Sequence, residues 1–143
     1  MTPTKRTPEV EAEILRRLSS GEPLTWICRD EGMPSATTWR EWCRADEGLD
    51  IAHARARNDG FDAIAEQCIE IAEDGTNDYV DRVRDGKVEK TFDAEHVQRS
   101  KLRVETRLKL LAKWDPKRYG DKLQTEHSGS MTVVSATPTD EAI

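Results

Sequence analysis

The sequence predicts a mainly α-helical protein. We expect a helix-turn-helix head, two long antiparallel central helices with a β-hairpin inserted between them, and a short strand near the C-terminal end. Apolar residues recur with helical spacing in three short and two long segments, and a glycine turn precedes the third short segment. Between the two long segments the periodicity changes around Asp85-Gly86, a dipeptide typical of a two-residue hairpin turn.

Composition limits the size of any core. Of the 143 residues, 36% are hydrophobic and 35% are charged, and the net charge is −6. Small helical units of this polarity tend to bury their apolar faces against further copies. No apolar stretch approaches membrane length and no signal-peptide apolar region is present, so we expect a cytosolic protein.

Charge is unevenly distributed along the chain. Residues 1–45 have no net charge, residues 46–93 carry −8, residues 94–123 carry +5, and the last twenty residues carry −3. An acidic chain is unsuited to nonspecific binding of nucleic acid, so any DNA contact would come from a localised patch.

The residue types that support catalysis or metal binding do not cluster. There is no CxxC pair, no metal-ligand spacing and no GxxxxGK[ST] loop, and no Ser/His/Asp or Cys/His arrangement can be singled out. We therefore expect no metal, no cofactor and no enzymatic activity. The scattered cysteines and histidines are Cys28, Cys43, Cys68, His53, His96 and His127.

Residues 1–48 form the predicted head. A short basic arm leads to Pro8, which suits the first helical position behind Thr7 as N-cap. A second short helix begins after Pro23, and a third runs from Ala36 to about residue 44, with Ser35 as its N-cap.

The third helix is the candidate recognition helix. Trp39 and Trp42 share its inner side, where large rings supply much of the core of a small domain. The opposite side would then face the major groove of DNA, or remain solvated, or dock a protein. With the arm and the first helix, the candidate DNA-binding residues are Lys5, Arg6, Arg16, Arg17, Ser35, Thr37, Thr38, Arg40 and Arg44.

Residues 49–115 form the predicted central domain. An acidic helix at 49–74 is interrupted by Gly60, where a kink or a close helix approach would fit. A hairpin at 79–92 would place Val83 opposite Val88, and a basic helix at 94–115 follows. The opposite charges suggest an antiparallel helix pair or a subunit contact. The candidate oligomerisation residues are Phe61, Ile64, Cys68, Ile71, Leu102, Val104, Leu108 and Leu111.

Residues 116–143 form the predicted C-terminal tail. Asp115-Pro116 ends the basic helix, and a polar segment follows. Within it, Met131 to Val134 could form a short strand.

Two blocks of the sequence resemble the small terminase subunits of tailed double-stranded DNA bacteriophages. The block "SSGEPLTWICRDEGMPSATTWREW" is similar to the family's helix-turn-helix, and "VQRSKLRVETRLKLLAKWDPKRYGDK" to its basic helix and following Pro-Lys-Arg-Tyr-Gly-Asp. The order of parts is also similar: DNA-binding head, helical middle, strand-forming tail. The likeness spans about residues 8–123, and the second block is its most specific part.

The resemblance implies a non-catalytic DNA-packaging component. Such a subunit assembles into a homo-oligomeric ring, most often an octamer or nonamer. It binds the viral packaging site on double-stranded DNA, and it recruits and regulates the large ATPase-nuclease subunit, here through the tail. The implied location is the cytoplasm of the infected bacterial host. A dimeric helix-turn-helix transcriptional regulator, or the DNA-binding component of a transposase, is the alternative.

Overall fold

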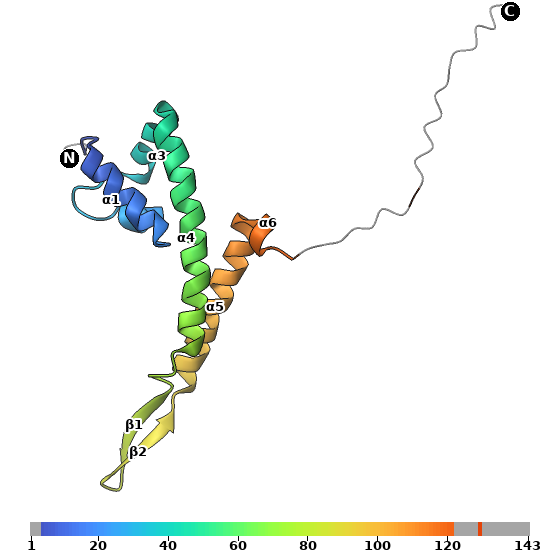
Figure 1. The fold of residues 1–143 in the computed structure, drawn as a ribbon. Coiled ribbons are helices and arrows are strands. Elements are labelled where there is room, and N and C mark those ends of the chain that lie inside the picture. The colour runs from blue at the N-terminus through green and yellow to red at the C-terminus, as the bar shows by residue number, and fades with distance from the viewer. Residues whose placement is uncertain (1–3, 122–128, 130–143) are drawn as a thin grey trace, which may run out of the picture.

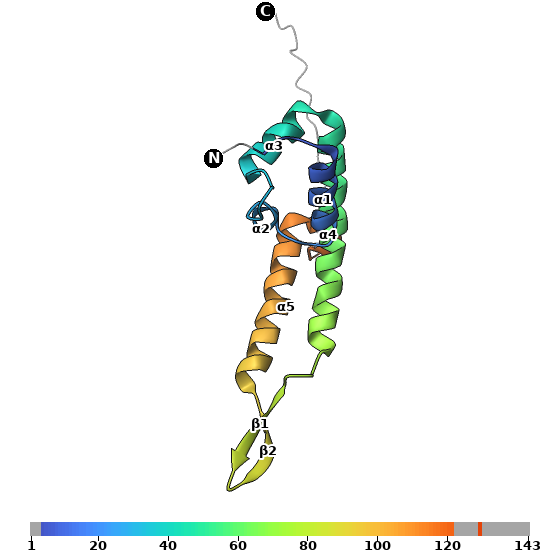
Figure 2. The same cartoon turned by 90° about the vertical axis from the view of Figure 1, so that its left-hand side faces the viewer.

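The structure is a computed structural model that describes residues 4–121 and Gly129. A helical head lies against one end of a long helix pair, and a β-ribbon extends from the other end (Figures 1 and 2). The elements are α1 (Pro8–Ser19), α2 (Leu24–Ile27), α3 (Ala36–Ala45), α4 (Glu47–Glu73), β1 (Tyr79–Arg84), β2 (Lys87–Phe92), α5 (Ala94–Trp114) and α6 (Pro116–Tyr119). The mainly helical class with one hairpin is confirmed. The strand expected at Met131 to Val134 lies outside the described residues.

The first and third helices begin at the predicted caps. The Thr7 hydroxyl accepts a hydrogen bond from the backbone N–H of Val10 at 3.2 Å, and Pro8 opens α1. The Ser35 hydroxyl accepts one from the backbone N–H of Thr38 at 3.1 Å and opens α3. Each cap satisfies an N–H group that has no partner within its helix.

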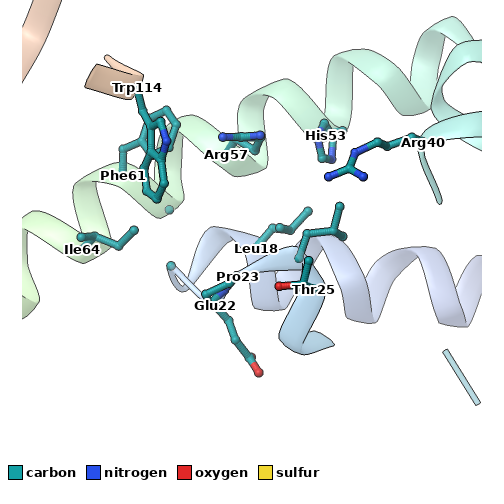
Figure 3. A pocket seen from close by; sticks show the side chains of 13 residues that line it. Leu18, Glu22, Pro23, Thr25, Arg40, His53, Arg57, Phe61, Ile64 and Trp114 are labelled. Carbon is teal, nitrogen blue, oxygen red and sulfur yellow. The ribbon is translucent and has the colours of Figure 1, made fainter. Parts of the chain in front are cut away.

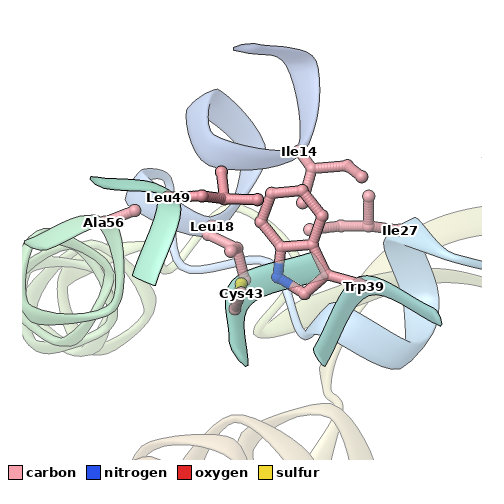
Figure 4. Close-up of a cluster of buried hydrophobic side chains, with 7 residues drawn as sticks. All are labelled: Ile14, Leu18, Ile27, Trp39, Cys43, Leu49 and Ala56. Atoms are coloured by element: carbon pink, nitrogen blue, oxygen red, sulfur yellow. The ribbon is translucent and has the colours of Figure 1, made fainter. Parts of the chain in front are cut away.

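The head is built around Trp39, which is fully buried. Its ring meets the partly buried Trp42 ring edge-on, with centroids 6.2 Å apart. Replacing a buried tryptophan by alanine costs about 3–5 kcal/mol, so this side chain is the main anchor of a small core. The core cluster in Figure 4 comprises Ile14, Leu18, Ile27, Trp39, Cys43, Leu49 and Ala56.

The long helix α4 completes the core of the head. Its residues Leu49 and Ala56 are buried in the same cluster as Trp39. The sequence predicts an end of the third helix near residue 44 and a start of the long helix at 49, whereas the structure leaves only Asp46 between them. The Asp46 carboxylate accepts a hydrogen bond from the N–H of Leu49 at 3.1 Å. Because the two helices join through one residue and share one core, the head is held firmly on α4.

Gly60 lies where α1 crosses α4. A Cβ atom at this position would stand 2.3 Å from the backbone oxygen of Leu18, a distance that no real side chain tolerates. Of the two expectations for this glycine, the close helix approach is therefore the correct one. Only a residue without a side chain allows the two backbones to meet so closely.

The helices α4 and α5 run antiparallel beside each other (Figures 1 and 2). The rings of Phe61 and Trp114 stack with centroids 5.8 Å apart, and Arg107 Nε donates a hydrogen bond to Gln67 Oε1 at 3.3 Å. Three of the residues expected to mediate oligomerisation, Phe61, Cys68 and Leu111, are instead buried within the protomer. They hold the helix pair together.

The β-hairpin has the predicted register. Val83 pairs with Val88 as expected, and the same register places Tyr79 opposite Phe92. It also joins residues of opposite charge, Asp81 with Lys90 and Arg82 with Glu89. Asp85 and Gly86 both adopt positive φ at the turn. A type I′ turn needs this conformation at both central residues, which explains why the Asp-Gly dipeptide specifies the register.

The Pro-Lys-Arg-Tyr segment folds as α6 and is fastened to α4. Arg118 Nη1 forms an ion pair with Asp62 Oδ1 at 2.7 Å, and the Tyr119 hydroxyl donates a hydrogen bond to the same carboxylate oxygen. These contacts hold the pKa of Asp62 below its ordinary value, and the hydrogen bond from Tyr119 has the largest effect.

None of the helices in the described part of the chain is long and apolar enough to span a membrane.

Gly60→Ala will destabilise the protein by about 1–3 kcal/mol, because the added methyl group forces α1 away from α4. Thermal unfolding followed by circular dichroism will measure the loss. The matched control is Gly48→Ala, on the same helix, whose Cβ would meet only the Asp46 side chain at 3.3 Å. An unchanged melting temperature for Gly60→Ala would contradict the close approach.

Candidate nucleic-acid interface

The free face of α3 carries the head's candidate DNA contacts. Trp39 and Cys43 turn into the core, which leaves Thr37, Arg40 and Arg44 exposed on the same helix. Arginine can form bidentate hydrogen bonds with guanine, and threonine can contact a thymine methyl group or a phosphate. The arrangement therefore has the chemistry that a recognition helix needs.

Ser35 and Thr38 are partly occupied by their own helix. Besides accepting the capping hydrogen bond, the Ser35 hydroxyl donates to Thr38 Oγ1 at 2.9 Å. One of the two hydroxyl protons is engaged in this contact, so a phosphate would find the pair partly occupied. Their first role is to start α3 and so to aim its N-terminal turn.

Three of the predicted arginines are already paired with carboxylates. Arg6 contacts Glu11 and Asp46, and these hydrogen bonds raise its pKa above the ordinary value. Arg17 contacts Glu22 and Asp30, and Arg16 Nη2 lies 2.7 Å from Glu13 Oε1. A phosphate would have to compete with these carboxylates.

Arg40 and Arg44 differ from those three, because neither forms an ion pair with any residue that the structure describes. Lys5 is exposed and is likewise without an ion pair within the described residues. The positive charge of the head that is available on its predicted DNA-binding residues therefore lies on α3 and in the arm, and Arg29, which follows α2, is likewise exposed and without an ion pair among the described residues.

A groove of about 220 Å³ runs beside Arg40, between the head and α4 (Figure 3). His53 and Arg57 line it from α4, and Phe61 and Trp114 form part of its apolar wall. The groove thus joins the cationic face of α3 to a second arginine on a different helix. The spacing of His53, Arg57 and Phe61 along one helical face was the available signal, but nothing in the sequence placed that face beside α3.

His53 connects the groove to the core. The indole Nε1 of Trp39 donates a hydrogen bond to His53 Nδ1 at 3.1 Å, so the imidazole accepts at that nitrogen. Burial lowers the pKa of His53, and the nearby charge of Arg57 lowers it further. The neutral form is therefore the one that the folded head stabilises.

The expected oligomerisation residues fall into three groups, of which the first, Phe61, Cys68 and Leu111, is buried. Leu102 and Leu108 are exposed on α5, whereas Ile64, Ile71 and Val104 are only partly covered. Exposed apolar residues of the helices that the expected set left out include Trp26, Ile51, Ile69, Leu110 and Trp114. In the part of the chain that the structure describes, no three His, Cys, Asp or Glu side chains come close enough to hold a metal ion.

Fold and site together define a helix-turn-helix protein mounted on a long helical pair. The chain belongs to the family described as bacteriophage Sf6 terminase small subunit-like, which it matches over residues 6–126. Terminase small subunits are components of bacteriophage DNA packaging.

Solved structures agree with this family. Crystal structures of the terminase small subunit gp1 of the bacterial virus Sf6, each carrying one substitution, are 34% identical in sequence to this chain. The matches cover 90% of this chain and 87% of the gp1 chain, with TM-scores of 0.64, 0.64 and 0.63. The comparison with curated proteins finds no match.

Acid will weaken the head through His53. Its pKa is depressed on folding, so its contribution is fully present above about pH 6.5 and is lost as the pH falls through the lower folded value. Melting temperatures measured from pH 7.5 to 5 will fall more for the wild type than for His53→Gln, by a few degrees. Parallel curves for the wild type and His53→Gln would refute this assignment.

Proposed function

We propose that this chain is the small subunit of a phage DNA-packaging terminase that binds the viral packaging site as a homo-oligomeric ring. It recruits and regulates the large ATPase-nuclease subunit and has no catalytic activity of its own. It works in the cytoplasm of the infected bacterium. Family membership supports the overall role, and the finer assignments are argued from the residues below.

The observation that carries DNA binding is the free positive charge on α3. Arg40 and Arg44 are exposed and form no ion pair among the described residues, whereas Arg6, Arg16 and Arg17 are held by carboxylates. Leaving charge unpaired on the exposed face of a recognition helix suits contact with DNA. Arg57, which lines the same groove as Arg40, adds a second cation for a backbone phosphate.

A ring makes weak heads effective. One head offers only a few DNA contacts, so its own affinity would be low. Eight or nine heads on one ring would bind neighbouring stretches of DNA together, and the effective concentration of the later heads would raise the overall affinity.

We assign the contact with the large subunit to residues 116–143. Its first part, α6, is fastened to Asp62 through Arg118 and Tyr119, which gives the rest of the region a defined starting point at Asp121. A chain ending at Asp121 is expected to form the oligomer and bind DNA but to lose co-purification with the large subunit.

Arg40→Ala combined with Arg44→Ala will weaken DNA binding at least tenfold at about 0.1 M salt. Fluorescence anisotropy on a mixed-sequence duplex of about 30 base pairs, repeated over a salt series, will measure it. Each lost phosphate contact lowers the salt slope by about one unit, so a lower slope separates phosphate contacts from base contacts. The matched control removes two hairpin arginines, Arg82→Ala with Arg84→Ala, and will leave affinity unchanged. Equal binding by both double variants would show that α3 is not the DNA-binding helix.

Native mass spectrometry at micromolar subunit concentration will show one large closed oligomer, with eight or nine copies expected. Such a species supports the ring and excludes the dimeric regulator or transposase component. A monomer or dimer alone would overturn the ring and favour that alternative.

A further inference from the structure

The groove beside Arg40 changes in character along its length. Figure 3 shows Phe61 and Trp114 together at one end, Arg57 in the middle and Arg40 at the other end. The Trp114 ring stacks on Phe61 and is still 46% exposed. The guanidinium carbon of Arg57 lies 5.5 Å from the centroid of the Phe61 ring. The groove therefore fits a ligand that is apolar in one part and acidic in another.

The charge that the groove offers to a ligand is positive. Its charged lining residues are Arg40, Arg57 and Glu22. Neither arginine forms an ion pair with any residue that the structure describes, whereas the Glu22 carboxylate is held by Arg17. Asp50, one turn before His53 on α4, is exposed and is not part of the lining. Two arginines are therefore available to carboxylates or phosphates that enter the groove.

Residues 130–143, SMTVVSATPTDEAI, have the composition of such a ligand. The apolar run from Met131 to Val134 precedes Asp140 and Glu141, and the segment contains no Lys, Arg or His. An apolar run suits a groove with an aromatic wall, and carboxylates form strong charge-assisted hydrogen bonds with arginine. The two acidic residues of the segment match the two available arginines of the groove in number and in sign.

The described chain leads towards this groove. Trp114 lines it at the end of α5, and α6 follows from Pro116. Arg118 then fastens α6 to α4, where its Nη2 donates a hydrogen bond to the Asn58 carbonyl oxygen at 3.3 Å. Residues 122–131 can span up to about 33 Å when extended. The α4 wall of the groove, two helical turns, is only about 12 Å long, so residues 130–143 can reach every part of it.

We propose that residues 130–143 bind in the groove of their own chain and compete with DNA for Arg40 and Arg57. Asp140 and Glu141 pair with the two arginines. The docking depends only on the groove and the segment, whereas the competition rests on the proposed DNA binding.

The order of residues in the segment agrees with the order along the groove. The chain leaves α5 and α6 at the aromatic end, so the apolar run at 131–134 meets Phe61 and Trp114 first. The acidic residues come later in the sequence and meet the arginines, which lie further along the groove. Because the same chain provides both the start of the path and the groove, the contact forms at a high effective concentration.

This contact links DNA binding to recruitment of the large subunit. The large subunit is proposed to bind residues 116–143, and binding there would withdraw residues 130–143 from the groove. The two arginines would then be free for DNA. Because such coupling is reciprocal, DNA in the groove would also release the segment for the large subunit.

A photoreactive amino acid will locate the segment in the full-length protein. p-Benzoylphenylalanine replaces Val133, the protein is irradiated, and the crosslinked peptides are identified by mass spectrometry. Most crosslinks will fall on α4 around Phe61 and on α5 around Trp114. The control places the same amino acid at Val88, which is exposed on the hairpin, and will not label the groove. Absence of groove crosslinks from position 133 would overturn the docking.

Isotope labelling will show whether the segment and the groove belong to one chain. Oligomers assembled from chains with light and heavy nitrogen will give crosslinks in which both peptides carry the same isotope. Mixed crosslinks at the frequency of random pairing would place the segment in a neighbouring chain and overturn the contact within one chain.

Reversing the charge of the groove will test the ion pairs. Arg40→Glu with Arg57→Glu will lower the yield of groove crosslinks by about fivefold or more, because attraction of the acidic residues becomes repulsion. The matched control, Arg29→Glu with Arg55→Glu, reverses two exposed arginines outside the groove and will keep the wild-type yield. Circular dichroism will verify that both variants are folded. Equal yields from the two variants would show that the groove arginines do not hold the segment.

Added DNA will test the competition. A saturating duplex of about 30 base pairs will lower the groove crosslinks of the wild-type groove by about fivefold or more, because phosphates take the same arginines. Crosslinks that persist while DNA is bound would overturn the competition. If the protein binds no duplex, the proposed function fails at that point, whereas the crosslinks formed without DNA still decide the docking.

Discussion

The contact between the backbones of α1 and α4 at Gly60 is the constraint on which the rest of the structure depends. It lets the head lie directly on the long helix, so that Leu49 and Ala56 of α4 join Trp39 in one core. With only Asp46 between α3 and α4, the head has no hinge of its own. A core this small gains most of its stability from burying a few large side chains, and it would lose that burial if a side chain at position 60 separated the helices.

A head fixed on α4 keeps its recognition helix in a constant orientation relative to the central helix pair. The Trp39–His53 hydrogen bond, at 3.1 Å, and the groove beside Arg40 are both products of that attachment. Under the proposed ring, every head then presents α3 at the same angle. Identical orientation is what allows several weak contacts to act on one stretch of DNA without a further loss of conformational entropy.

The arginines of this protein differ in whether they form ion pairs with carboxylates. In the head, Arg6, Arg16 and Arg17 form ion pairs with carboxylates. Arg40 and Arg44 form none among the described residues. In the central pair, Asp62 is engaged by Arg118 and Tyr119. Two of the head's arginines without an ion pair among the described residues therefore lie on α3, where the protein is proposed to meet DNA.

The sequence by itself determined the local features: the caps at Thr7 and Ser35, the turn at Asp85-Gly86 with its strand register, and the inward side of α3. These depend on neighbours a few residues away, so their physics can be read from the chain. Tertiary structure alone decided which arginines are paired, that Arg57 lies beside Arg40, and that Phe61, Cys68 and Leu111 are buried within the chain. Those outcomes depend on how helices far apart in the sequence cross. The crossing is set by close packing between two backbones, which helical periodicity does not reveal.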